Sequence, residues 1–138
     1  MFSIEIIPKI WIGDIDALKI SHNINCVINC VKDLGFLDKH KNYKYGIRNN
    51  LEKYEIIKMY EYLDESCDYI YKNLLNDRNI LIICENGNQK SVSVVCAFLI
   101  KYGNMSKNDA INSIRTKHKT AFYPTSDYDM PLEMMENR

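Results

Sequence analysis

The clearest pattern of hydrophobic and polar positions lies between residues 79 and 102, where a continuous apolar run is followed by apolar residues at helical spacing. It opens with an unbroken apolar run at 80–84, rich in β-branched residues and too short for a free-standing helix, which predicts a buried strand. The polar segment 85–88 consists of turn formers and predicts a tight loop. From Lys90 onward apolar residues recur at helical spacing. We therefore expect a strand, a loop and a helix in direct succession.

The remaining chain alternates between short β-prone runs and amphipathic stretches. Further strands are predicted at 4–7, 10–12, 24–31 and 43–47, with a surface loop at 32–42. Further helices are predicted at 55–75 and from 106 to about 117. Asp14 is expected to cap a helix, Ser106 and Asp109 are typical of a capping box, and Gly103 is a typical helix stop.

Length and charge limit the class of protein. A chain of 138 residues is expected to form one domain, residues 1–138, that buries roughly 68–70% of its unfolded surface. The formal net charge is zero, so the sequence carries no electrostatic sign of nucleic acid or of an acidic membrane. It has no apolar run near the ~20 residues of a spanning helix and no leader pattern. We expect a soluble intracellular protein, cytoplasmic or nuclear, whose partners are proteins.

The cysteine count favours a reducing compartment. The chain has 5 cysteines, an odd number, and most of them lie in apolar periodic segments. Cys26 and Cys30 lack a second pair at ligand spacing, so we expect neither a metal nor a cofactor. The three histidines His22, His40 and His118 are predicted to be solvated. Abundant Ile, Asn, Lys and Tyr are typical of AT-rich genomes, such as those of viruses and protists; a viral protein would work in its host cell.

Candidate chemistry lies where the predicted strand meets the loop. Cys84 is the last residue of the apolar run, just before the loop and the start of the next helix. A helix N-terminus and a ring of loop amides would bind an anion and favour the thiolate form of cysteine. This position therefore predicts an anion site with a nucleophile at its base.

The segment Cys84-Glu85-Asn86-Gly87-Asn88-Gln89-Lys90-Ser91 resembles the phosphate-binding loop of cysteine-dependent protein phosphatases. That loop reads His-Cys, five residues, Arg, then Ser or Thr. Cys84, Gly87 and Ser91 match it, whereas Lys90 stands at the arginine position and Ile83 at the histidine position.

Two flanking segments resemble dual-specificity phosphatase domains in particular. Residues 7–17, with Trp11 as a predicted core residue, resemble their opening, and residues 123–128 resemble the start of their last helix, with Thr125 in place of Asn. The resemblance covers residues 7–136 and implies an α/β fold. It implies a central, mostly parallel β-sheet with helices on both faces and a shallow pocket at the carboxyl ends of the strands.

The resemblance also implies roles for individual residues. Cys84 would be the nucleophile, and Ser91 would support its thiolate. The phosphate would be bound by the loop residues Glu85, Asn86, Gly87, Asn88, Gln89 and Lys90. The general-acid aspartate falls on Leu51, with Glu52 one residue further as an alternative acid. Lysine cannot grip two oxygens with a planar fork, and Glu85 adds a charge that repels a phosphate dianion.

These substitutions lead to three hypotheses. The first is a catalytically impaired dual-specificity phosphatase, or pseudophosphatase, that binds proteins, phosphorylated ones included. The second is a weak but genuine phosphatase that forms a phosphocysteine on Cys84 and uses Glu52 as its acid. The third is a protein-binding module without phosphate recognition. The sequence leaves the partner, the preferred phosphoamino acid and the oligomeric state open.

Overall fold

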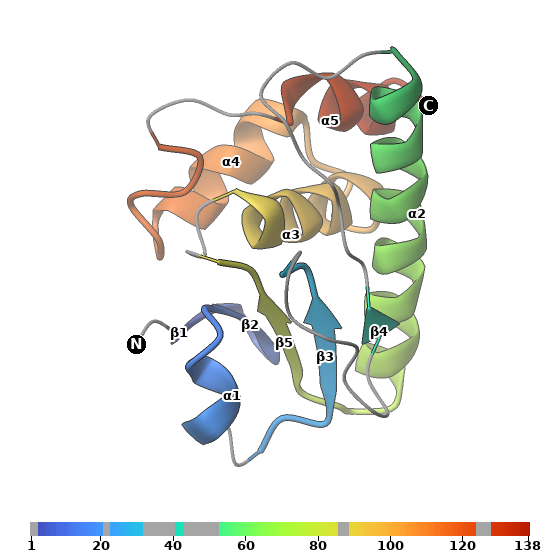
Figure 1. The fold of residues 1–138 in the computed structure, drawn as a ribbon. Coiled ribbons are helices and arrows are strands. Elements are labelled where there is room, and N and C mark those ends of the chain that lie inside the picture. Colours follow the sequence, from blue (N-terminus) through green and yellow to red (C-terminus); the bar gives the residue numbers. More distant parts are fainter. Residues whose placement is uncertain (1–2, 21–22, 32–40, 43–52, 86–88, 124–127) are drawn as a thin grey trace.

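The computed structural model describes residues 3–20, 23–31, 41–42, 53–85, 89–123 and 128–138 (Figure 1). Its elements, in chain order, are β1 (Ser3–Ile7), β2 (Ile10–Gly13), α1 (Ala17–Ile20), β3 (Cys26–Asn29), β4 (Lys41–Asn42), α2 (Lys53–Leu75), β5 (Ile80–Ile83), α3 (Lys90–Lys101), α4 (Lys107–Arg115) and α5 (Asp129–Glu136).

The strands form one five-stranded sheet in the order β1-β2-β5-β3-β4. β1 and β2 form an antiparallel hairpin, whereas β2, β5, β3 and β4 run parallel. The central strand β5 ends beside both neighbours, because Ile83 pairs with Gly13 of β2 and with Asn29 of β3. The expected mostly parallel central sheet is confirmed, and its carboxyl ends meet at one edge.

Helices cover both faces of the sheet, as expected. The helices α2 to α5 lie on one side and the short α1 on the other (Figure 1). Residues of β5 alternate between the two sides: Ile80 and Ile82 belong to the large core under α2 to α5, and Leu81 and Ile83 to a smaller cluster with Ala17 of α1. Burial on both faces explains why β5 reads as an unbroken apolar run.

Helix α2 confirms the prediction of a long amphipathic helix at 55–75, but its predicted apolar face was too wide. Met59, Leu63 and Ile70 are buried on this face. Tyr71, predicted to lie on it, keeps 42% of its surface exposed. Its ring stacks on that of Tyr102, with centroids 4.3 Å apart, so the partner that it finds lies at the surface rather than in the core.

The predicted helix caps are present. The Asp14 carboxylate accepts a hydrogen bond from the Ala17 backbone at 3.3 Å. Ser106 Oγ accepts one from the Asp109 backbone at 3.1 Å, as in a capping box. The sheet edge after β3 is formed by β4, and the strand predicted at 43–47 lies outside the described residues. Within the described part of the chain, no helix has the length and apolarity needed to cross a bilayer.

The prediction for His118 was wrong, because its side chain is only 3% exposed. α4 ends at Arg115, earlier than expected, and the chain continues in tight turns. The His118 backbone donates to the Ile114 carbonyl at 2.9 Å, and the His118 carbonyl accepts from Ala121 at 3.1 Å. These turns fold the segment back on the core, so neighbouring lysines did not imply solvent around the histidine. His22 and His40 lie outside the described residues.

Candidate active site

The thiol of Cys84 lies at the carboxyl end of the central strand, directly after β5. Its backbone N–H donates to the Gly13 carbonyl of β2 at 3.2 Å, and the preceding carbonyl, of Ile83, accepts from the Cys30 N–H at 2.8 Å. The strand is thus fixed from both sides where the loop begins. Cys84 is 1% exposed, which places its thiol at the base of the predicted loop rather than on the surface.

Ser91 contacts this thiol from the first turn of α3. Its Oγ lies 3.1 Å from the Sγ of Cys84, and Ser91 is fully buried. A hydroxyl at this distance can donate a hydrogen bond to a thiolate and stabilise its negative charge. The nearby N-terminus of a helix favours the same charge. The structure therefore brings together the predicted nucleophile and its predicted supporting hydroxyl.

Lys90, the first residue of α3, binds a carboxylate in this structure. Its Nζ lies 2.8 Å from the Oε1 of Glu85, the residue after Cys84. The lysine side chain is 13% exposed and that of the glutamate 48%, so the glutamate is the outer partner of the pair. We call these two residues the loop ion pair. The sequence had indicated both charges but not that one neutralises the other.

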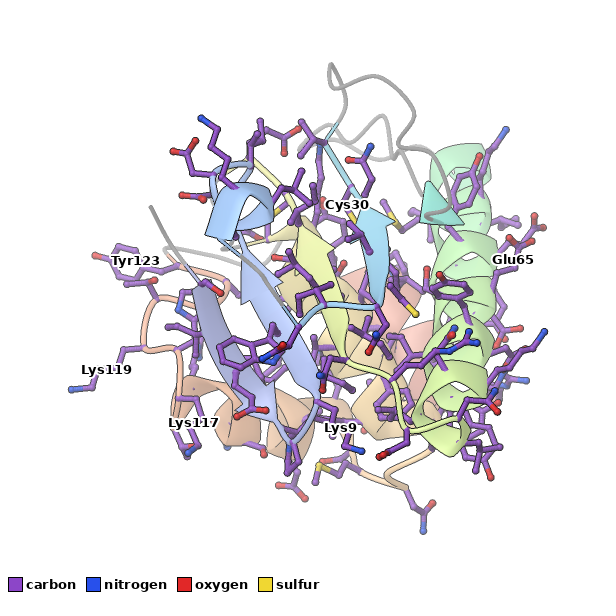
Figure 2. All side chains as sticks on the ribbon, turned by 90° about the horizontal axis from the view of Figure 1, so that it is seen from below. Lys9, Cys30, Glu65, Lys117, Lys119 and Tyr123 are labelled. Carbon is purple, nitrogen blue, oxygen red and sulfur yellow. The ribbon has the colours of Figure 1, made fainter. Side chains whose placement is uncertain are left out.

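Gln89 connects the loop to the segment after α4. Its Nε2 donates to the Tyr123 carbonyl at 3.5 Å, a long hydrogen bond. The preceding residue, Phe122, is buried with a positive φ of 58°, an uncommon conformation for a bulky side chain. Tyr123 is 68% exposed and projects away from the body of the protein (Figure 2). The sequence analysis did not foresee this contact, since nothing in the local pattern joins residues so far apart.

Cys30 is a neighbour of the site that the sequence analysis missed. It directly follows β3, the strand beside β5, as Figure 2 shows. Its side chain is completely buried. Burial raises the pKa of its thiol well above the usual value, electrostatic interaction with Cys84 and Glu85 acts in the same direction, and Lys90 opposes them. Cys30 is therefore held as a neutral thiol. The sequence carried one signal for this: the two predicted strands, 24–31 and 80–84, each have a cysteine at or near the carboxyl end.

Several predicted site residues lie outside the described part of the chain. They are the loop residues Asn86, Gly87 and Asn88, the residue Leu51 at the general-acid position, and its neighbour Glu52. Among the described residues, no three His, Cys, Asp or Glu side chains lie close enough together to hold a metal ion. The described site thus consists of a buried thiol, a supporting hydroxyl and a neutralised charge pair at the start of a helix.

A parallel sheet that delivers a buried cysteine to a helix N-terminus, with a serine hydroxyl against its sulfur, defines a thiol-based anion site. Comparison with known proteins gives the family. The model of the dual specificity phosphatase catalytic domain matches residues 10–138. The chain therefore belongs to the dual-specificity phosphatase family.

Individual relatives support this assignment. "Putative tyrosine phosphatase 123R" of Invertebrate iridescent virus 6 is 26% identical over 98 residues, which cover 69% of this chain and 68% of that protein. The crystal structure of human DUSP28 superposes with a TM-score of 0.80 at 13% identity, over 98% of this chain and 93% of that one. That of human tyrosine phosphatase-like serine/threonine/tyrosine-interacting protein gives a TM-score of 0.81 at 14% identity, over 98% and 95% of the two chains. At these identities the two structures show the shared fold.

Proposed function

We propose that this domain is a catalytically impaired dual-specificity phosphatase, a pseudophosphatase that binds phosphorylated protein partners inside the cell. The observation that carries the proposal is the state of position 90. A lysine replaces the family's arginine there, and its ammonium is already bound to Glu85 at 2.8 Å. A guanidinium would offer a planar fork to two phosphate oxygens, whereas an ammonium is a point charge.

The retained features support phosphate binding rather than turnover. Cys84 and Ser91 keep their contact at 3.1 Å, and the loop leads into the N-terminus of α3. This arrangement accepts an anion without requiring the chemistry that follows. The fold itself does not decide between the two functions. It is shared by Tk-PTP, whose crystal structure is described as the active form. It is also shared by the human protein named tyrosine phosphatase-like serine/threonine/tyrosine-interacting protein.

The expected loss of rate is large. A missing general acid, as Leu51 would cause, typically costs about 10²–10⁴-fold. The loss of one preorganised donor to the transition state costs about 10²–10³-fold. Even if these losses overlap, little turnover on phosphoproteins remains.

The second candidate is a weak but genuine phosphatase. The intact contact between Cys84 and Ser91 favours it, since a domain without any thiol chemistry would not need this pair. In this mechanism the thiolate attacks phosphorus, the phosphoryl group moves to sulfur, and the alcohol leaves with a proton from Glu52. Water then releases inorganic phosphate and regenerates the thiolate.

A phosphatase assay combined with a binding assay tests the proposal. We expect kcat/KM on an aryl phosphate and on phosphotyrosine and phosphothreonine peptides to be at least about 100-fold below that of an active family member. The same peptides should shift the backbone amide signal of Ser91 in a saturable way. Turnover near the family level that Cys84→Ser abolishes would contradict the proposal. Glu52→Gln would then show whether this residue is the acid.

If the peptides leave the signals of residues 85–91 unchanged, the domain binds its partners without phosphate recognition. That outcome would favour the third hypothesis, a protein-binding module of the same fold. Correct folding of each variant is checked by thermal melts, so that a missing signal is not confused with an unfolded protein.

A further inference from the structure

The loop ion pair joins the two described residues that flank the predicted phosphate loop in the sequence. Glu85 directly follows the nucleophile position, and Lys90 is the first residue of α3. Between them lie the residues whose backbone amides are predicted to bind phosphate. The Nζ of Lys90 lies 2.8 Å from the Oε1 of Glu85. A carboxylate of the protein itself therefore binds the ammonium that a phosphoryl group would use.

The two partners are unequal in their access to solvent. Lys90 is the more buried partner: its side chain is 13% exposed, and its backbone carbonyl accepts a hydrogen bond from Ser93 Oγ at 2.6 Å. Glu85 is the half-exposed partner, with 48% of its side chain accessible. If an anion enters from solvent, the glutamate can rotate outward while the lysine stays in place. An ion pair this exposed is weak, so a dianion can open it.

We propose that Glu85 is an internal competitor for the phosphate site: its carboxylate occupies Lys90 in the resting protein and is displaced when a phosphoryl group binds. This inference rests on the proposed function, in which the loop binds phosphate. An ammonium has three donors, but a carboxylate and a phosphate dianion brought to the same ammonium repel each other. A phosphorylated partner with contacts outside the loop then offsets the competition better than free phosphate does.

The competition has a measurable signature in a double-mutant cycle. Four proteins are compared: the natural chain, Glu85→Gln, Lys90→Gln and the double variant. The dissociation constant for inorganic phosphate is measured from the backbone amide signal of Ser91. We expect Glu85→Gln to bind up to about 10-fold more tightly, because the apparent affinity falls with the fraction of molecules in which Lys90 is free.

The cycle separates competition from simple repulsion. If Glu85 occupies Lys90, then Lys90→Gln costs little affinity in the natural chain and about 10-fold more in the Glu85→Gln background. If Glu85 only repels phosphate, Lys90→Gln costs the same in both backgrounds, and the inference is overturned while the proposed function stands. If none of the four folded proteins binds phosphate, phosphate recognition falls, and the inference falls with it.

Glu65→Gln is the matched control for net charge. Glu65 is exposed on α2 and points away from the body of the protein (Figure 2). The Glu65→Gln variant loses the same charge without a change in the loop, so we expect it to bind phosphate with the affinity of the natural chain. A gain as large as that of Glu85→Gln would mean that overall charge, not the loop ion pair, sets the affinity, and would overturn the inference.

Discussion

Replacing Lys90 by arginine is expected to restore activity fully only when Glu85 is removed as well. A guanidinium matches a carboxylate with two parallel hydrogen bonds, so the introduced arginine would bind Glu85 at least as firmly as the lysine does. At the 2.8 Å of the loop ion pair, two unit charges attract by about 1.5 kcal/mol in water-like surroundings. Glu85 is half-exposed, so this low value applies, and because ordering the two side chains costs entropy it sets an upper limit of about 10-fold on the occupation of the arginine by Glu85.

The rates follow from this occupation. A free arginine is worth about 10²–10³-fold through its preorganised donors. If only about a tenth of the molecules have the arginine free, Lys90→Arg alone gains about 10–10²-fold. The double variant Lys90→Arg with Glu85→Gln should gain the full 10²–10³-fold, or about ten times more than the single variant.

The assay is kcat/KM on an aryl phosphate whose phenol is acidic enough to leave without a proton. Turnover of this substrate does not depend on a general acid, so the assay isolates the effect of position 90. On phosphothreonine peptides, whose alkoxide leaves poorly, Leu51→Asp should be needed in addition. Glu65→Gln serves again as the control for net charge, and thermal melts establish that all variants fold.

Two results would refute the reasoning. If Lys90→Arg alone gains as much as the double variant, Glu85 does not hold the side chain at position 90. If neither variant gains anything while both bind phosphate, the defect lies in the thiol and not in the loop ion pair.

Three further predictions concern the rest of the molecule. Gly103→Ala should lower the free energy of unfolding by about 2 kcal/mol in denaturant melts, because the added Cβ would lie 2.5 Å from the Leu99 backbone oxygen. Hydrogen bonding from Lys101 lowers the pKa of Asp68, so Asp68→Asn should destabilise by less than about 1 kcal/mol at pH 7. This difference should vanish in melts as pH falls through the lowered pKa of Asp68. Burial raises the pKa of Cys96 to about 12, so mass spectrometry should find it alkylated at pH 8 only after unfolding.

The sequence predicted most of the scaffold because burial leaves a periodic trace. The run 80–84 could only be a strand covered on both faces, and the structure buries Ile80 to Ile83 completely. The helix cap at Ser106 was predictable because it depends only on residues within one turn: its side chain accepts a hydrogen bond from the Asp109 backbone. The contact of Cys84 with Ser91 was implied by the resemblance to the phosphate-binding loop of cysteine-dependent phosphatases, and the structure shows it at 3.1 Å.

The rest depended on contacts that no periodicity records. Glu85 and Lys90 were each interpreted correctly as charges, but their mutual contact depends on how side chains turn across a loop. Cys30 adjoins the site because β3 pairs with β5, a pairing between distant segments. His118 was misjudged because tight turns after α4, not the charges beside it, decide its burial.

The burial of Ile83 limits which residues position 83 can accept. This isoleucine stands where the family has a histidine, and it is fully buried against Ala17, Val27 and Val31. A histidine restored here would bring a polar ring into an apolar cluster, at a cost of about 1–3 kcal/mol if one of its nitrogens found no partner. Natural domains have only about 5–15 kcal/mol of stability in total. Restoring the family's histidine alone would therefore use a sizeable fraction of this stability, so the apolar packing around Ile83 and a histidine at the same position exclude each other.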